Sequence, residues 1–346
     1  MHQALYHPAH GYYSSGRCAI GRKGDYFTNV SVGPLFGQLL GAQFAEIWER
    51  LGKIDGFAIV EQGAHDGQFA RDVLESAQAR SPEFFAALRY RIVEPFPALQ
   101  GRQTRMLAPF RDKVEWHESL QPFMGVHFSN ELLDAMPVRL ISGATEKLVA
   151  LEGNSFVLIE RPLPSQGATA SEPLQKQGVF NQPALDWIDD VAAKLQRGYV
   201  IAIDYGRLGD EFRADVQARA QHRNLNSPFE QIGHADITMC VDWTSIAERA
   251  PVRGLHVAGF TDQHHFLTGI ISTWPDLLQA SSSNSTALSG RVQVARPDRK
   301  TKRALHTLLH PEMLGRAFQV LALARNLDPG APRLAGFRFA REPRFG

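Results

Sequence analysis

The chain has 346 residues, which is enough for one large α/β domain or for two domains with a sizeable core. Its formal net charge of +1 gives no reason to expect a nucleic acid or an anionic membrane as a partner held by bulk electrostatics. The only cysteines, Cys18 and Cys240, are too few for a disulfide framework or a zinc site, and no apolar run approaches the roughly 18 residues of a membrane span. Because the first residues also lack the pattern of a secretion signal, the expected class is a cytoplasmic enzyme.

A turn-rich stretch and a long helix are the first elements expected along the chain. The stretch covers residues 21–28 and includes Gly24 and Asp25. Apolar residues at three- and four-residue steps then predict an amphipathic helix from about 33 to 51, and Gly52 suits the position just after a helix end. We expect this helix to pack onto a sheet.

The most informative pattern begins with a buried strand at 57–60. A loop bounded by Gly63 and Gly67 follows, at the point where a strand turns into a helix. After that helix a second strand is predicted at 90–93. In a parallel sheet Glu94 then lies at the carboxyl edge beside the glycine loop, where a carboxylate can accept hydrogen bonds from both hydroxyls of a ribose. The pattern predicts a ligand that contains adenosine.

Two further strands are predicted at 114–116 and 125–129. The second leads directly into a polar cluster that contains Asn130, Glu131 and Asp134. Ligands of open α/β sheets bind at this edge, and burying so many polar groups is costly unless something pairs with them. A structural alternative stays open, in which Asn130 caps a following helix and Asp134 is solvated on its outer face.

A change of pattern after Pro137 predicts an antiparallel insertion at 138–178. Two apolar stretches flank Gly153 and Asn154, which is typical of a β-hairpin. The end of the insertion, 162–178, is rich in Pro, Ser, Gly, Ala and Gln and is predicted to be a mobile loop.

Strands and helices alternate again after the insertion. A helix is predicted from about Pro183 to Gly198, a buried strand at 199–203 and a helix at 244–250, whereas the polar tract at 281–286 is predicted to be a disordered connection.

This alternation predicts an α/β fold with a doubly wound, mostly parallel, Rossmann-like sheet and an inserted β-hairpin region. The sheet domain would comprise 1–137, with an N-terminal helical extension, and 179–346. The insertion and its loop would occupy 138–178.

The sequence lacks the motifs that are typical of several kinds of catalysis. There is no HExxH arrangement, no Gly-x-Ser-x-Gly elbow and no Walker-type Gly-Lys-Ser/Thr, which disfavours catalytic zinc chemistry, nucleophilic hydrolysis and phosphoryl transfer. An NAD-dependent oxidoreductase remains an alternative, because a glycine loop with a distal acid, here Gly67 and Glu94, also describes dinucleotide sites. That alternative does not explain the polar cluster at Asn130 and Glu131.

Together these segments resemble the MidA family of class I S-adenosylmethionine-dependent methyltransferases, whose mitochondrial members act as complex I assembly factors that methylate a protein arginine. The resemblance covers nearly the whole chain, and the combination of motifs is more specific than any one of them. The matching motifs are Gly24-Asp25-Tyr26-Phe27-Thr28, Val60-Glu61-x-Gly63-x-x-x-Gly67, Val93-Glu94, Asn130-Glu131-x-x-Asp134-Ala135-x-Pro137, Ile203-Asp204-Tyr205-Gly206 and Met313-Leu314-Gly315-x-x-Phe318-Gln319.

The resemblance implies that S-adenosyl-L-methionine, the methyl donor, lies over the carboxyl ends of the strands. It also implies a protein substrate, with a respiratory-complex subunit as the suggested partner, and a transfer that needs no metal. If the acceptor is a guanidinium, Glu131 and Asp134 are the candidate catalytic residues, because carboxylates orient its planar fork. The implied cofactor-binding residues are Gly24, Asp25, Glu61, Gly63, Gly67, Glu94 and Asn130.

Two features depart from the family pattern. His65 stands where the family has the middle glycine of the loop, and a side chain is disfavoured there if the backbone takes a positive φ. The chain also begins close to the Tyr6-His7-Pro8 block, so the upstream helix typical of the family is expected to be missing. A second hypothesis is therefore a non-catalytic assembly or scaffolding protein, in which His65 fills a degenerate pocket.

Overall fold

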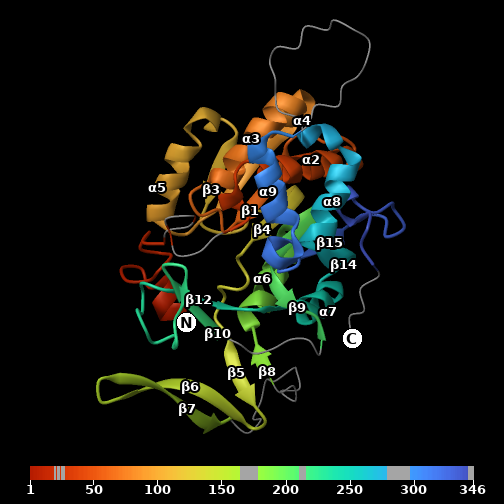
Figure 1. The fold of residues 1–346 in the computed structure, drawn as a ribbon. Helices are drawn as coiled ribbons and strands as arrows, with labels where there is room; N and C mark the ends of the chain where they lie inside the picture. The colour runs from red at the N-terminus through yellow and green to blue at the C-terminus, as the bar shows by residue number, and fades with distance from the viewer. Residues whose placement is uncertain are drawn as a thin grey trace, which may run out of the picture.

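Figure 1 shows the fold of the chain in a computed structural model, which describes residues 1–18, 21, 24, 28–163, 178–209, 216–278 and 297–341. The predictions for Asp25, for most of the loop at 162–178 and for the polar tract at 281–286 lie outside the described residues. Within the described part of the chain, no helix is long and apolar enough to cross a membrane.

A mostly parallel sheet forms the centre of the fold. Among the described residues it has eight strands, in the order β14-β15-β9-β4-β1-β2-β3, with β13 paired to β9 outside this path. The strands β3, β2, β1, β4 and β9 run parallel, and β15 is antiparallel to both of its neighbours. The bounds are β1 Phe57–Gln62, β2 Leu88–Val93, β3 Val114–His117, β4 Phe123–Asn130, β9 Leu195–Arg207, β13 Val241–Asp242, β14 His256–Asp262 and β15 Phe318–Arg325.

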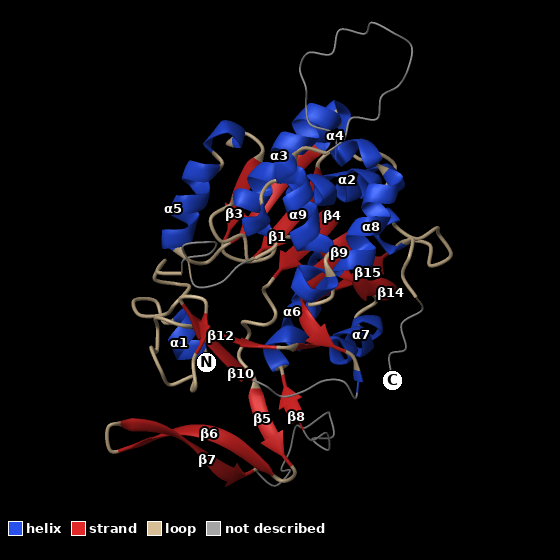
Figure 2. Ribbon diagram, viewed as in Figure 1, coloured by secondary structure: helices blue, strands red, loops and turns tan. Residues whose placement is uncertain are grey.

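Helices pack along both faces of this sheet (Figure 2). Phe57 and Ile59 of β1 join the core that contains α2, α3, α8 and α9, while Ala58 and Val60 join the core that contains α6 and α7. Side chains alternate along a strand, so a strand covered on both faces is apolar at every position. The helix bounds are α1 His2–Tyr6, α2 Leu35–Arg50, α3 Gln68–Arg80, α4 Pro82–Ala87, α5 Pro97–Met106, α6 Gln182–Lys194, α7 Trp243–Val252, α8 Gln263–Thr273 and α9 Arg299–Leu309.

This architecture confirms the predicted fold class, a doubly wound, mostly parallel sheet with an inserted β-hairpin region. The insertion is a separate antiparallel sheet of order β7-β6-β5-β8, and β6 and β7 form the hairpin around Gly153. Its strands are β5 Arg139–Ser142, β6 Thr145–Glu152, β7 Ser155–Pro162 and β8 Gly178–Phe180.

A third, small sheet lies beside the N-terminal segment (Figure 1). It consists of β10 Val216–Ala220, β11 Arg223–Asn224 and β12 Asp236–Met239. Leu5 and Tyr12 of the N-terminal segment share a small apolar cluster with Ala218 and Ile237 of this sheet. The packing holds the first residues of the chain against the body of the protein.

The predicted helix end at Gly198 is wrong, because α6 ends at Lys194 and Gly198 lies within β9. The backbone of Gly198 has φ +141°, and a side chain there would collide with the carbonyl of Gly125 on β4. Glycine is therefore needed at this position, because β9 and β4 approach each other too closely for a side chain. Strand β15, for which no prediction exists, is a run of alternating Leu and Ala residues that suits a buried helix as well as a strand.

Candidate functional site

A cavity of about 600 Å³ opens at the carboxyl ends of β1, β2 and β4. This volume lies within the usual range for sites that bind small molecules. The loops that follow these strands form one side, and His2, Tyr6 and Tyr13 of the N-terminal segment contribute to its lining. The lining residues at the sheet edge include Glu61, Gln62, Gly63, Ala64, His65, Glu94, Asn130, Glu131 and Leu132.

Glu94 follows β2 and is fixed in place by two donors. Its Oε1 accepts a hydrogen bond from the Phe96 backbone N–H (3.1 Å), and its Oε2 accepts one from Nε2 of Gln103 (3.0 Å). The same Gln103 nitrogen donates to the carbonyl of His65, which ties the glycine loop to Glu94. Burial raises the pKa of Glu94, although both donors favour its ionised form. Each carboxylate oxygen has further lone pairs, so the group can accept hydrogen bonds from a ligand in the cavity.

The glycine loop adopts the backbone conformation that makes glycine preferred. Gly63, His65 and Gly67 have φ values of +83°, +46° and +86°. Histidine tolerates this left-handed region better than most residues, and the cavity keeps its volume of about 600 Å³ although His65 is part of its lining. The His65 imidazole therefore does not fill the site.

The His65 side chain lies beside Asp66, with Nδ1 and Oδ1 3.7 Å apart. Burial opposes a charge on the imidazole, but the interactions with Asp66 and Cys18 outweigh burial and raise the pKa of His65 to about 9. A cation thus lies in the loop near Glu94, and it favours the ionised form of that carboxyl.

Glu61 lines the cavity from within β1 and is bound by a tyrosine. The hydroxyl of Tyr90 donates to Glu61 Oε2 at 2.6 Å, and both side chains are buried. Burial raises the pKa of Glu61 to about 8, because the single donor does not offset the loss of water.

Asn130 and Glu131 follow β4 as a hydrogen-bonded pair on the cavity wall. Asn29 Nδ2 donates to Asn130 Oδ1 (3.0 Å), and Asn130 Nδ2 donates to Glu131 Oε1 (2.9 Å). Burial and the nearby Asp204 raise the pKa of Glu131 to about 8. Glu131 has φ +54°, and a turn rather than a helix follows it, so the alternative in which Asn130 caps a helix is wrong.

Asp134 lies outside the cavity. It is 6% exposed and is not among the lining residues, so neither contact with a substrate nor exposure to solvent on a helix face fits its position. Oδ2 of the neighbouring Asp204 accepts the backbone N–H groups of Leu132, Leu133 and Asp134 at 3.1, 2.8 and 3.2 Å, which holds the turn after β4. Burial with Asp204 and Asp236 nearby raises the pKa of Asp134 well above its ordinary value, so Asp134 holds the proton of this pair.

The remaining predicted site residues are Gly24, Asp25 and Gly67. Gly24 is described but does not line the cavity, and Asp25 lies outside the described residues. Gly67 begins α3 and also lies outside the lining, and a side chain there would crowd Leu107 and Gln103. Its role is to allow the close packing of α3 against α5.

Sequence reasoning missed the contribution of the N-terminal segment to the cavity. Tyr6 stacks with Tyr13 and with Phe96, at ring-centroid distances of 5.8 and 6.2 Å. The Tyr6 hydroxyl donates to the carbonyl of Ala135, and the Tyr13 hydroxyl donates to Asp236. Hydrogen bonding thus occupies the hydroxyls of this aromatic wall. No local motif marks such a contact, because it joins residues more than a hundred positions apart.

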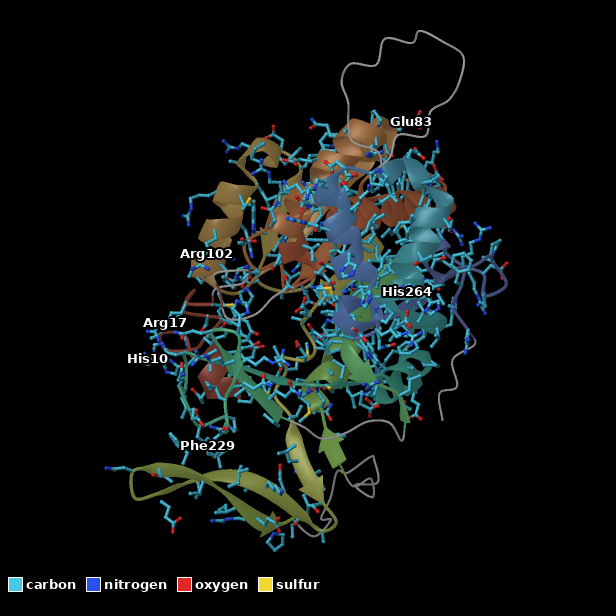
Figure 3. All side chains as sticks on the ribbon, in the orientation of Figure 1. His10, Arg17, Glu83, Arg102, Phe229 and His264 are labelled. Atoms are coloured by element: carbon cyan, nitrogen blue, oxygen red, sulfur yellow. The ribbon has the colours of Figure 1, made fainter. Side chains whose placement is uncertain are left out.

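A second attachment of the N-terminal segment is made by Arg102 of α5, which Figure 3 labels on the same side of the molecule as Arg17. The Arg102 guanidinium donates to the carbonyls of Gly16 and Cys18. The segment is therefore held both at Ala135 and Asp236 and at α5.

Residues 39–261 match the Methyltransf_28 family of S-adenosyl-L-methionine-dependent methyltransferases. The chain belongs to this family. A COG1565 superfamily member of Burkholderia thailandensis, whose crystal structure contains S-adenosyl-homocysteine, is 27% identical and superposes with a TM-score of 0.82 over 99% of this chain and 90% of that chain. A native crystal structure of a protein from the same organism is 26% identical, with a TM-score of 0.79 over 99% and 89%.

Curated relatives belong to one named group. In Drosophila melanogaster the relative is named protein arginine methyltransferase NDUFAF7 homolog, mitochondrial; it is 26% identical over 77% of this chain and 69% of its own length. Human protein arginine methyltransferase NDUFAF7, mitochondrial, is 25% identical over 99% of this chain and 82% of its own length. The present protein is thus an S-adenosyl-L-methionine-dependent methyltransferase, and S-adenosyl-L-methionine is its cofactor.

Proposed function

We propose that this methyltransferase transfers the methyl group to an arginine side chain of a protein. The names of the relatives support this acceptor. The observation in this chain that carries the proposal is the Glu131 carboxyl on the cavity wall, with its pKa raised to about 8 by burial. A bound guanidinium keeps its charge at any working pH, would favour the ionised carboxyl and would match it with paired hydrogen bonds.

The cavity suits the donor. Its volume of about 600 Å³ is adequate, and the fixed Glu94 carboxylate has lone pairs for both hydroxyls of a ribose. The left-handed Gly63 lets the backbone come close to the ligand. S-adenosyl-L-methionine supplies a methyl group activated for displacement on a positively charged sulfur, so positioning by the protein contributes most of the remaining rate.

Glu131 would both orient the acceptor and receive its proton. The acceptor nitrogen has to lose a proton when it gains a methyl group. The bound guanidinium favours the ionised form of Glu131, and a carboxylate whose pKa is raised by burial is a stronger base for that proton than an exposed one. Asn130 holds one oxygen of Glu131, which fixes the direction of the other. Asp134 would act only through the turn that Asp204 holds, as a positioning residue.

The test is methyl transfer to two peptides that differ by one arginine-to-lysine change. Transfer to the arginine peptide alone is expected, and Glu131→Gln should lower kcat about a hundredfold or more, with the affinity for S-adenosylhomocysteine within threefold of wild type. Glu118→Gln, which alters another carboxyl of the cavity lining, is the matched control. Preference for the lysine peptide, or an unchanged kcat in Glu131→Gln, would contradict the proposal.

The scaffolding hypothesis makes a different prediction about His65. If the imidazole obstructed the site, His65→Gly would raise the affinity for S-adenosylhomocysteine tenfold or more. Because the cavity remains open beside His65, we expect a change below about threefold, measured by calorimetry. A respiratory-complex subunit as the substrate and a cytoplasmic location stay predictions, to be tested by affinity capture with a methylation assay and by cell fractionation.

A further inference from the structure

A buried polar cluster lies directly behind the cavity. Gln62, the last residue of β1, lines the cavity, and its side-chain oxygen Oε1 is 2.8 Å from Nε2 of His127 on β4 and 2.9 Å from Nε1 of Trp187 on α6. His127 is fully buried and Trp187 is 5% exposed. The two rings pack edge to face, with centroids 5.5 Å apart.

The chemistry of these partners fixes the orientation of the Gln62 amide. An indole N–H can only donate, so the atom beside Trp187 is the amide oxygen and not the nitrogen. The same oxygen faces His127, which must therefore donate from Nε2. Burial keeps this imidazole neutral, because it lowers the pKa of His127 to about 3.

The amide nitrogen of Gln62 is consequently a donor group that points away from both rings. No described residue accepts a hydrogen bond from it, and it belongs to a side chain that lines the cavity. Gln62 pairs in register with Val93, the residue before Glu94, so the adjacent strands β1 and β2 bring Gln62 and Glu94 to the lining of the same cavity. A pair of amide protons at this place favours an anionic ligand group.

We propose that the amide nitrogen of Gln62 binds the carboxylate at the amino-acid end of the methyl donor, and that His127 and Trp187 are positioning residues that hold the amide in this orientation. The inference rests on the donor placement proposed above, with the ribose at Glu94. It does not depend on the identity of the methyl acceptor.

Two ligands separate this contact from a general effect on the cavity. S-adenosylhomocysteine carries the carboxylate, and 5′-methylthioadenosine has the same nucleoside without it. In Gln62→Glu the side chain keeps an oxygen for both rings but loses the amide protons and repels an anion. We expect the affinity for S-adenosylhomocysteine to fall at least about tenfold, the value of one hydrogen bond to a charged group, while 5′-methylthioadenosine binds within twofold of wild type. Gln196→Glu, an exposed change at the opposite end of the sheet, is the control.

Trp187→Phe is the second variant, because it removes one donor and leaves an aromatic ring in place. It should weaken S-adenosylhomocysteine about threefold to tenfold with no effect on 5′-methylthioadenosine, since the second donor from His127 remains. Nitrogen-15 NMR of the ligand-free protein should show His127 protonated on Nε2 only.

Four outcomes would overturn the inference. Equal weakening of both ligands in Gln62→Glu and Trp187→Phe would mean that the cluster only supports the fold. Unchanged S-adenosylhomocysteine affinity in both variants would remove the contact, and a His127 protonated on Nδ1 would remove the argument for the amide orientation. If wild-type protein binds neither ligand, the donor placement fails as well, whereas failed arginine methylation with intact binding leaves this inference standing.

Discussion

Replacing Glu94 by glutamine tests the donor placement most directly. The carboxylate already accepts hydrogen bonds from Phe96 and Gln103, and the proposed ribose adds two hydroxyl donors. A hydrogen bond to a charged group contributes about 1.5–3 kcal/mol. Loss of the charge from two such bonds weakens donor binding by about 3 kcal/mol, which is about 150-fold in affinity.

The assay is calorimetric titration of Glu94→Gln and wild type with S-adenosylhomocysteine. Glu115→Gln is a matched control, because it makes the same chemical change on the neighbouring strand β3, at a side chain that is 47% exposed. The titration is repeated at lower pH. Since burial raises the pKa of Glu94, wild-type affinity should be lost as the pH falls through this pKa, and the loss should be absent in Glu94→Gln.

Two results would refute this reasoning. If Glu94→Gln binds S-adenosylhomocysteine within threefold of wild type, the ribose does not lie at this carboxylate. If both Glu94→Gln and Glu115→Gln weaken binding equally, the effect comes from a general change in charge. Thermal unfolding of each variant separates loss of the fold from loss of the contact.

Two further predictions concern the other buried carboxyls. Burial raises the pKa of Glu61 from 4.5 to about 8, so the folded state retains a proton that the unfolded chain releases, and stability falls as the pH rises through this window. Glu61→Gln should reduce this loss of stability by at most about 5 kcal/mol. The measurement is the free energy of unfolding in urea at pH 5 and at pH 8, and an equal loss in Glu61→Gln and wild type would contradict the prediction. Burial raises the pKa of Asp204 to about 7, so the comparison is made at pH 8, where Asp204 is ionised. There Asp204→Asn should lower the free energy of unfolding by about 2 kcal/mol, because three backbone N–H groups donate to one carboxylate oxygen. Asp134→Asn should change it by less than about 1 kcal/mol, because Asp134 already carries a proton. Equal losses in the two variants would refute the assignment of the proton.

The parallel strands of the sheet and the position of the cavity could be predicted from the sequence because they depend on local patterns. A strand buried on both faces is a continuous apolar run, as at 57–60, and the loop that follows requires glycine where φ is positive. The carboxyl ends of parallel strands meet at one edge, so the acids and amides that follow them gather there.

The contribution of the N-terminal segment could not be predicted in the same way. Tyr6 reaches Ala135 and Phe96 only after the segment packs against the small sheet that contains Ile237. Each of these contacts joins distant parts of the chain, and none leaves a periodic pattern in the sequence. For the same reason the role of Gln62 could not be predicted, because it depends on a contact with Trp187 of α6, which lies far away in the sequence.

Four strands carry an acid at their carboxyl ends, and in the sequence these acids look equivalent: Glu61, Glu94, Glu131 and Asp204. These four carboxyl groups differ in the hydrogen-bond donors that surround them. Asp204 receives backbone N–H groups on both oxygens and holds a turn, while Glu94 receives one donor on each oxygen and keeps lone pairs toward the cavity. Burial raises the pKa of Asp204 to about 7 and those of Glu61 and Glu131 to about 8, but only Glu61 and Glu131, each with one side-chain donor, line the cavity as sites of proton exchange near neutral pH. Of these two, only Glu131 lies in the turn after β4, beside the amide of Asn130. This position, on a loop at the cavity wall and not within a strand, is the reason why Glu131 and not Glu61 is the proposed proton acceptor.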